Sequence, residues 1–305
     1  MNKVVSRRNF IGAAALGAGA AMLPSHLAAS DYSENENFEN VQNSEQEGPP
    51  LKIGMMSWLF GSEWDLDTFI KNCTETNYLH AELRTTHKHG VELTLNRAQR
   101  LDVKKKIADS ALEAISLASA YMYHFPDQRL VRENIEGTKE YLQLAADVGA
   151  IGIRVFPDAL LDEVPEEQTM AQIGKALAEV GKVGNDLGVD VRLCVHGRRT
   201  NQVHVIKQII DYSESPYVYV NWNCEQNDLR GAGFHANYNM LKDRIRGVHL
   251  KELRSEAYPY REFFRLLRAD GYTGYCNCEI GRISCDPLDF MRYYRALFLA
   301  YQNVI

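Results

Sequence analysis

The feature that most constrains the fold is a regular alternation of short apolar segments and amphipathic segments from Leu51 to the end of the chain. Helical periodicity fills the longer gaps, as in residues 128–148 and 168–187. The apolar segments begin roughly 30 residues apart, which is the length of one βαβ repeat. The predicted strands are residues 51–57, 79–84, 113–119, 151–156, 189–195, 217–222, 246–251 and 273–280. This alternation predicts eight βα units and a parallel sheet.

Two architectures suit such a chain. A doubly wound open sheet usually carries a glycine-rich phosphate loop after its first strand, and the sequence GMMSWLFG at residues 54–61 lacks the required spacing. A closed (β/α)8 TIM barrel needs about 250 residues, which residues 51–305 supply. The sequence therefore predicts a single-domain TIM barrel over 51–305. Its last helix should begin at Pro287, with Asp286 as the N-cap.

The first 50 residues differ in texture from the rest. Residues 1–30 carry paired arginines, Arg7 and Arg8, then a Gly/Ala-rich stretch and a small-residue end. These are the parts of a twin-arginine export signal, whose core is too short and weakly apolar for a stable membrane span. The alternative is a basic N-terminus on an uncleaved helix. Residues 31–50 are polar and acidic and predict a flexible linker. Because of the signal in residues 1–30, the barrel is expected to be exported to the periplasm.

Charge and cysteine content narrow the class of partner. Removal of residues 1–30 takes away three basic residues and no acid, so the formal charge falls from −6 to −9. An acidic surface disfavours nucleic acid and suits a small polar solute. The six cysteines are too few for a disulfide scaffold, and Cys276 and Cys278 are expected to pack against the outer helices.

Polar side chains gather where the predicted strands end. The sequence VRLCVHGRRT at residues 191–200 puts Arg192, Cys194 and His196 on one face of a strand that breaks at Gly197. Comparable polar residues end the other strands, namely Glu82, Arg84, His87, His89, Arg154, Asn223, His249, Lys251 and Glu279. Single examples are often structural ion pairs or solvated histidines. Together they predict a functional pocket at the C-terminal end of the barrel.

The combination ELRTTHKHGVE, VHGRRT, NWN, VHLKEL and CEIG resembles the sugar phosphate isomerase/epimerase proteins of the xylose-isomerase-like TIM-barrel superfamily. The resemblance implies a divalent metal held by a Glu on strand five, an Asp or Asn on strand six, a His on strand seven and a Glu on strand eight. Position by position, these are Cys194 in place of the expected Glu, then Asn223, His249 and Glu279.

The departure at Cys194 leaves three hypotheses open. In the first, a Cys194 thiolate joins His249 and Glu279 around zinc, with Asn223 or water completing the shell. In the second, the metal, whether zinc or manganese, is absent and the pocket works by acid–base chemistry. In the third, the pocket binds a sugar without turning it over. Packing alone also accounts for a small buried thiol.

The resemblance implies a sugar or keto-sugar substrate and proton abstraction next to a carbonyl, giving isomerisation, epimerisation or water elimination. Glu279, Glu82 and His196 are the expected acids and bases. The expected substrate-binding residues are Arg84, His87, His89, Arg154, Arg198, Trp222 and Lys251. The alternative is a non-catalytic carbohydrate-binding barrel, and an endonuclease activity is opposed by the charge. The oligomeric state stays open.

Overall fold

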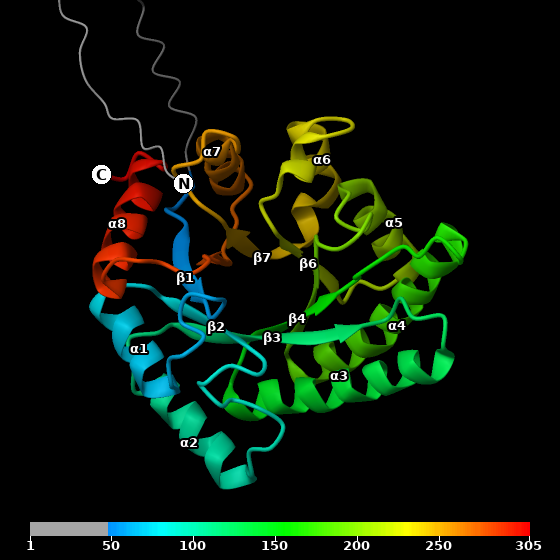
Figure 1. Cartoon of the computed structure of the whole chain (residues 1–305), viewed down its shortest axis with the longest axis horizontal. Helices are drawn as coiled ribbons and strands as arrows, with labels where there is room; N and C mark the ends of the chain where they lie inside the picture. The colour runs from blue at the N-terminus through cyan, green and yellow to red at the C-terminus, as the bar shows by residue number, and fades with distance from the viewer. Residues whose placement is uncertain (1–47) are drawn as a thin grey trace, which may run out of the picture. The chain divides into compact units, whose positions relative to one another are not determined.

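The computed structural model describes residues 48–305, so the predicted export signal and nearly all of the predicted linker lie outside the described residues. Eight parallel strands pair in chain order, and β8 pairs with β1 to close the barrel (Figure 1). The strands are β1 Lys52–Met56, β2 His80–Arg84, β3 Ala114–Met122, β4 Gly152–Phe156, β5 Asp190–Cys194, β6 Val218–Trp222, β7 Ile245–Leu250 and β8 Tyr275–Cys278. The predicted (β/α)8 barrel is confirmed.

One helix follows each strand and lies outside the barrel (Figure 1). The helices are α1 Leu66–Glu75, α2 Arg97–Ala108, α3 Gln128–Val148, α4 Glu166–Leu187, α5 Val203–Ser213, α6 Phe234–Leu241, α7 Tyr260–Ala269 and α8 Pro287–Ala300. The predicted start of α8 is confirmed, because the Asp286 carboxylate accepts hydrogen bonds from the amides of Leu288 and Asp289. Two 3₁₀ turns, η1 Gln226–Leu229 and η2 Lys242–Arg244, flank α6.

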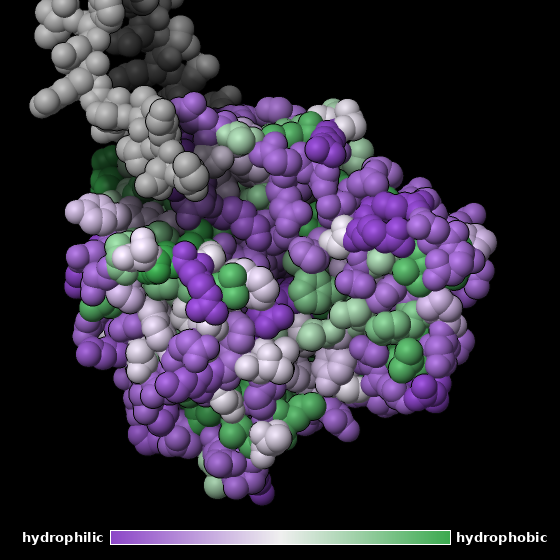
Figure 2. Space-filling view, viewed as in Figure 1, coloured by the Kyte–Doolittle hydropathy of each residue, from purple (hydrophilic) through white to green (hydrophobic). Residues whose placement is uncertain are grey.

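Strand alternation separates an apolar outer face from a polar interior. The outward Val and Leu side chains form the core between the strands and the helices. Cys276 and Cys278 share this outward phase and are buried, as expected. On the face drawn in Figure 2 hydrophilic residues predominate, and hydrophobic ones form small separate patches. Within residues 48–305, no helix combines the length and apolar character needed to cross a bilayer.

Glycines make room for the polar interior. A Cβ on Gly152 would lie 2.7 Å from the Arg192 guanidinium, and a Cβ on Gly247 would lie 2.5 Å from Asn221 Oδ1. A Cβ on Gly54 would clash with Asn277 Oδ1. Real Cβ atoms do not approach other atoms this closely, so the three glycines let large polar side chains fill the barrel below its C-terminal mouth.

Candidate active site

His249, on β7, is the centre of a buried polar network. Its Nε2 lies 3.0 Å from Glu82 Oε1, and its Nδ1 lies 3.3 Å from Glu279 Oε2. The side chain is only 1% exposed. Burial disfavours the charged ring, but the two facing carboxylates outweigh it and raise the pKa of His249 well above its ordinary value. The ring is therefore an imidazolium that donates to both glutamates.

Glu82, on β2, lies beneath His249 rather than in the open pocket. Its second oxygen, Oε2, accepts a hydrogen bond from Asn277 Nδ2 at 2.8 Å. Asn277 Oδ1 in turn accepts a hydrogen bond from His80 Nδ1 at 2.7 Å. Burial lowers the pKa of His80 to about 4, so that ring is neutral. Both Glu82 oxygens are engaged and the residue is 2% exposed. This geometry makes Glu82 a positioning residue for His249.

Lys251 and Glu279 form an ion pair at the mouth of the barrel. Lys251 Nζ also donates to Asn223 Oδ1 at 3.2 Å, while Asn223 Nδ2 donates to Glu225 Oε1 at 2.6 Å. Burial alone would raise the pKa of Glu279, but His249 and Lys251 together hold it far below its ordinary value. The Glu279 side chain remains 14% exposed and that of Lys251 33%, so both reach the pocket.

Cys194, on β5, points into the same interior and is 2% exposed. Its Sγ lies 3.9 Å from Asn221 Nδ2, and it is close enough to His249 to affect the pKa of that ring. The thiol is therefore part of the polar layer around His249.

Two arginines line the opposite side of the mouth. Arg154, on β4, is 3% exposed; its Nη1 donates to the Ser119 carbonyl at 2.9 Å, and its guanidinium lies 3.9 Å from the centre of the Phe156 ring. Arg84, at the end of β2, lies 4.8 Å from the Trp58 ring centre. Burial lowers the pKa of Arg84, and the charge of nearby Arg154 lowers it further.

The two loop histidines have different surroundings. His89 Nε2 donates to the Arg84 carbonyl at 2.8 Å, and its Nδ1 accepts from the Val91 amide at 3.1 Å. With both ring nitrogens bonded to backbone, His89 holds the loop together instead of facing a substrate. His87 accepts a hydrogen bond from Arg84 Nη1 at 3.2 Å and contacts Ser57 Oγ at 3.3 Å, so it steadies the Arg84 side chain.

Three further predicted residues lie at the edge of the network or outside it. His196 is exposed at the mouth, with its ring centre 5.2 Å from that of Phe156. Arg198 is on the rim, 52% exposed and paired with Asp162 at 3.0 Å. Trp222, which was expected to bind substrate, does not face the mouth. It is fully buried on the outer face of β6, where its indole N–H donates to Tyr258 Oη at 2.8 Å. Its neighbours Asn221 and Asn223 face inward, so strand alternation forces Trp222 outward.

Sequence reasoning missed several members of the network. Asn277 and His80 hold Glu82, and Glu225 holds Asn223. Alternation could have found the first two, since Asn277 precedes Glu279 by two residues and His80 precedes Glu82 by two. Glu225 lies in a loop, where no periodicity predicts the direction of a side chain.

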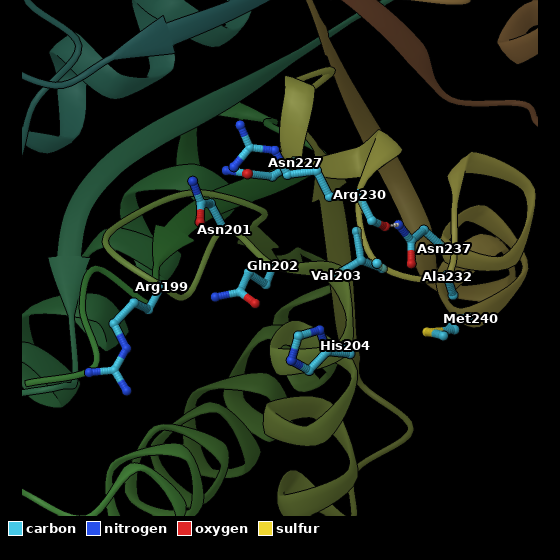
Figure 3. A pocket seen from close by; sticks show the side chains of 11 residues that line it. Arg199, Asn201, Gln202, Val203, His204, Asn227, Arg230, Ala232, Asn237 and Met240 are labelled. Atoms are coloured by element: carbon cyan, nitrogen blue, oxygen red, sulfur yellow. Dashed lines mark hydrogen bonds between the residues drawn. The ribbon is translucent and has the colours of Figure 1, made fainter.

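Two cavities flank this end of the molecule. One of about 520 Å³ is lined by Glu225 and Lys251 of the network. A larger one, of about 710 Å³, lies between the loop that enters α5 and the segment that enters α6. Figure 3 shows Gln202 and His204 on one side of it and Asn237 on the other. Among the described residues that line it, the larger cavity has no carboxylate and no residue of the His249 network.

Residues 70–293 match the family described as xylose isomerase-like TIM barrel, and the chain belongs to that family.

Solved structures with the same fold include L-ribulose 3-epimerase, with a TM-score of 0.70 and 16% identity over 83% of this chain and 95% of that one. Another is 3-keto-D-glucoside 4-epimerase from E. coli, with a TM-score of 0.69 and 18% identity over 82% of this chain and 99% of that one. A third is the IolI protein with a bound zinc atom, with a TM-score of 0.63 and 13% identity over 82% of this chain and 98% of that one. No curated protein matches the sequence.

A divalent metal implied by the resemblance can be tested against the four expected ligands. Cys194, Asn223, His249 and Glu279 do come together at the mouth. However, the Lys251 ammonium lies against Asn223 Oδ1 and Glu279, and both His249 nitrogens donate to carboxylates. Within residues 48–305, no three His, Cys, Asp or Glu side chains are arranged to hold a metal ion. This arrangement does not fit a divalent metal, because two positive side chains already neutralise its carboxylates.

Proposed function

We propose that this protein is an exported enzyme that moves a proton next to the carbonyl of a sugar or keto-sugar, as isomerases and epimerases do. The observation that carries the proposal is the Glu279–Lys251 ion pair at the barrel mouth, anchored from below by buried His249. An ionised carboxylate beside an ammonium places a base next to a hydrogen-bond donor. The epimerase names of the structural relatives support the same class of substrate.

In this proposal, Glu279 accepts the proton from the carbon next to the carbonyl. Lys251, whose pKa is raised by Glu279 in spite of its burial, stays protonated and donates a hydrogen bond to the oxygen that becomes the enolate. When Lys251 turns towards that oxygen, Glu279 loses one of its two cationic neighbours. Its pKa then rises, and the carboxylate becomes a stronger base at the moment it is needed.

His196 is the proposed second proton-transfer group. It follows β5, three strands from β8 around the barrel, and partial desolvation at the mouth lowers the pKa of its ring below the ordinary value. As an imidazolium, which its lowered pKa makes a stronger acid, His196 can give a proton to the face of the carbon that Glu279 does not reach, and delivery from that face inverts the centre. The cycle closes when Glu279 releases its proton to water and the neutral His196 ring takes one up. In this account Glu82 holds His249 and takes no proton itself.

Export is proposed from the paired arginines, Arg7 and Arg8, and the Gly/Ala-rich stretch that follows them. Fractionation of cells that produce the full chain should place the protein in the periplasm. Replacement of both arginines by lysine should retain it in the cytoplasm. Periplasmic delivery that is insensitive to this replacement would contradict a twin-arginine route.

The activity can be tested by solvent-deuterium exchange. The protein is incubated in D₂O with a panel of ketoses and 3-keto-glucosides, and loss of the proton signal next to the carbonyl is followed by NMR. Glu279→Gln should slow the exchange by about 100-fold or more, the usual contribution of an acid–base group. Glu133→Gln, at an exposed helix position where the carboxylate pairs with Arg129, is the matched control and should not change the rate.

Exchange that persists unchanged in Glu279→Gln would remove Glu279 from the mechanism. Saturable sugar binding with no exchange for any compound would favour the alternative, a carbohydrate-binding barrel without catalysis. The inward Cys194, where the family pattern has a glutamate, is the feature that favours that alternative.

A further inference from the structure

We infer that the substrate carries an anionic group, and that Arg84 and Arg154 bind it on the side of the mouth opposite Lys251. This inference rests on the proposed function, because it names the chemical class of the sugar that the same pocket accepts. The group is a carboxylate or a phosphate, and both offer oxygens that match the donors of a guanidinium.

Arg154 is a buried cation without a counter-ion among the described residues. Within residues 48–305 it forms no ion pair, its Nη1 bonds only to the Ser119 carbonyl, and its Nε has no hydrogen-bond partner. Arg192 is equally buried but pairs with Asp190 at 3.0 Å. A buried guanidinium without a counter-ion is costly to fold, so its presence beside the barrel mouth points to a negatively charged ligand.

The neighbouring carboxylate, that of Glu82, does not fill that role. Glu82 is close enough for the charge of Arg154 to act on it, but both Glu82 oxygens are bonded to His249 and Asn277. The imidazolium of His249 already balances the charge of Glu82. Arg154 is therefore left with an unmatched positive charge and a free N–H.

Arg84 adds a second positive charge beside the first. Among the described residues it has no ion-pair partner; its guanidinium contacts the Trp58 ring and the neutral acceptor nitrogen of His87. These two neighbours hold the guanidinium in a fixed position without neutralising it. Two adjacent guanidinium groups repel each other, and one anion between them would remove the repulsion and satisfy their free donors.

The charges around the mouth also set the orientation of the ligand. Glu279 and Glu225 lie on the β6–β8 side, and both would repel an anion. The anionic end of the substrate is therefore directed to Arg84 and Arg154, and its carbonyl end to Lys251. A keto-sugar or aldose with an acidic group at the far end, such as a uronate, satisfies both ends at once.

Calorimetric titration of the purified protein tests this directly. D-glucuronate and D-galacturonate are compared with glucose, galactose and glucose 6-phosphate. The acidic sugars should bind at least about tenfold more tightly than their neutral counterparts, as one charge-assisted hydrogen bond implies. Arg154→Met should abolish this preference, and Arg84→Met should reduce it. Arg292→Met, at an exposed arginine of α8, is the control and should behave as the unmodified protein.

The melting temperature of each variant shows whether a loss of binding comes from the anion site or from unfolding. Arg154→Met removes a buried charge and retains the apolar stem, so the variant should melt at the same temperature or higher while the preference for the acidic sugars is lost. Equal affinity for acidic and neutral sugars in the unmodified protein would overturn the inference, as would uronate binding that survives Arg154→Met. Tighter binding of the phosphate that also depends on Arg154 supports the anion site and assigns phosphate to it.

Failure of this inference can be told apart from failure of the proposed function. Deuterium exchange on neutral ketoses without any preference for acidic sugars would overturn the anion site alone. Arg154-dependent binding of acidic sugars without exchange would overturn the proposed enzyme activity alone.

Discussion

The Lys251 ammonium lies between the Asn223 carbonyl and the Glu279 carboxylate. Asn223 and Glu279 are two of the positions that the family resemblance assigns to a metal. The positive charge between these two positions is therefore supplied by the Lys251 side chain. With Cys194 in place of the strand-five glutamate, the Glu279 carboxylate is bordered by the Lys251 ammonium and the His249 imidazolium, and no carboxylate comes from strand five.

Metal content is the first prediction. Protein purified without chelator should contain far less than one equivalent of zinc or manganese by mass spectrometry of the metals. The double substitution Cys194→Glu and Lys251→Met restores a carboxylate and removes the ammonium, and this variant should gain affinity for Mn²⁺ or Zn²⁺. One equivalent of metal in the unmodified protein would show that Lys251 moves aside and would favour the zinc hypothesis.

The second prediction concerns Glu82→Gln. Removal of this carboxylate leaves the buried His249 ring with one counter-ion instead of two, so the free energy of unfolding should fall by about 3 kcal/mol, and the exchange rate should fall with it. Urea denaturation measures the first effect and NMR exchange the second. Glu133→Gln should change stability by less than about 0.5 kcal/mol, as an exposed substitution does. Wild-type stability in Glu82→Gln would mean that His249 is not held as an imidazolium.

A third prediction comes from Asp228, a fully buried carboxyl in η1 whose Oδ1 has no partner in the described residues. Burial raises its pKa to about 7. The unfolded chain ionises this group near pH 4, so from about pH 4 to 7 the folded state alone keeps the proton, and stability is lost as the pH rises. Above pH 7 the loss is complete.

Asp228→Asn removes this loss. Its amide oxygen can still accept from Tyr258 Oη and the Glu225 amide, as the carboxylate does at 2.8 and 2.9 Å. Chemical denaturation at several pH values should give the variant a free energy of unfolding at least about 2 kcal/mol higher than that of the parent at pH 8. At pH 4 the two free energies should be equal. A difference between the two proteins that is independent of pH would contradict the assignment.

The fourth prediction tests the packing of the polar interior. Gly54→Ala forces a Cβ into Asn277 Oδ1 and His80, so it should cost about 1–3 kcal/mol in the free energy of unfolding. Gly281→Ala is the matched control, since a Cβ there meets no atom within 4 Å. If both substitutions were equally mild, the barrel interior would be looser than this arrangement implies.

Most of the fold could be predicted from sequence because alternation of elements is a strong signal. The helix over 128–148 was predicted to the residue, and the eight strands were found within a few residues at each end. The short α6 with its flanking 3₁₀ turns was not, because eight residues carry little periodicity.

The candidate site was predictable only in part, and strand phase decides which part. Alternation placed Arg192, Cys194 and His196 on the inward face of the β5 segment, and the same rule excludes Trp222. The bonding of His89 to backbone and the contact between Lys251 and Asn223 depend on loop and tertiary geometry. No local pattern in the sequence encodes them.

The most direct test of the account is the rate of solvent-deuterium exchange next to the substrate carbonyl in chelator-treated protein. Chelator treatment should leave this rate unchanged. Lys251→Met should lower the rate by about 100-fold, while Lys242→Met, at an outer lysine paired with Asp270, should have no effect. Exchange that disappears with chelator, returns with zinc or manganese and tolerates Lys251→Met would contradict it.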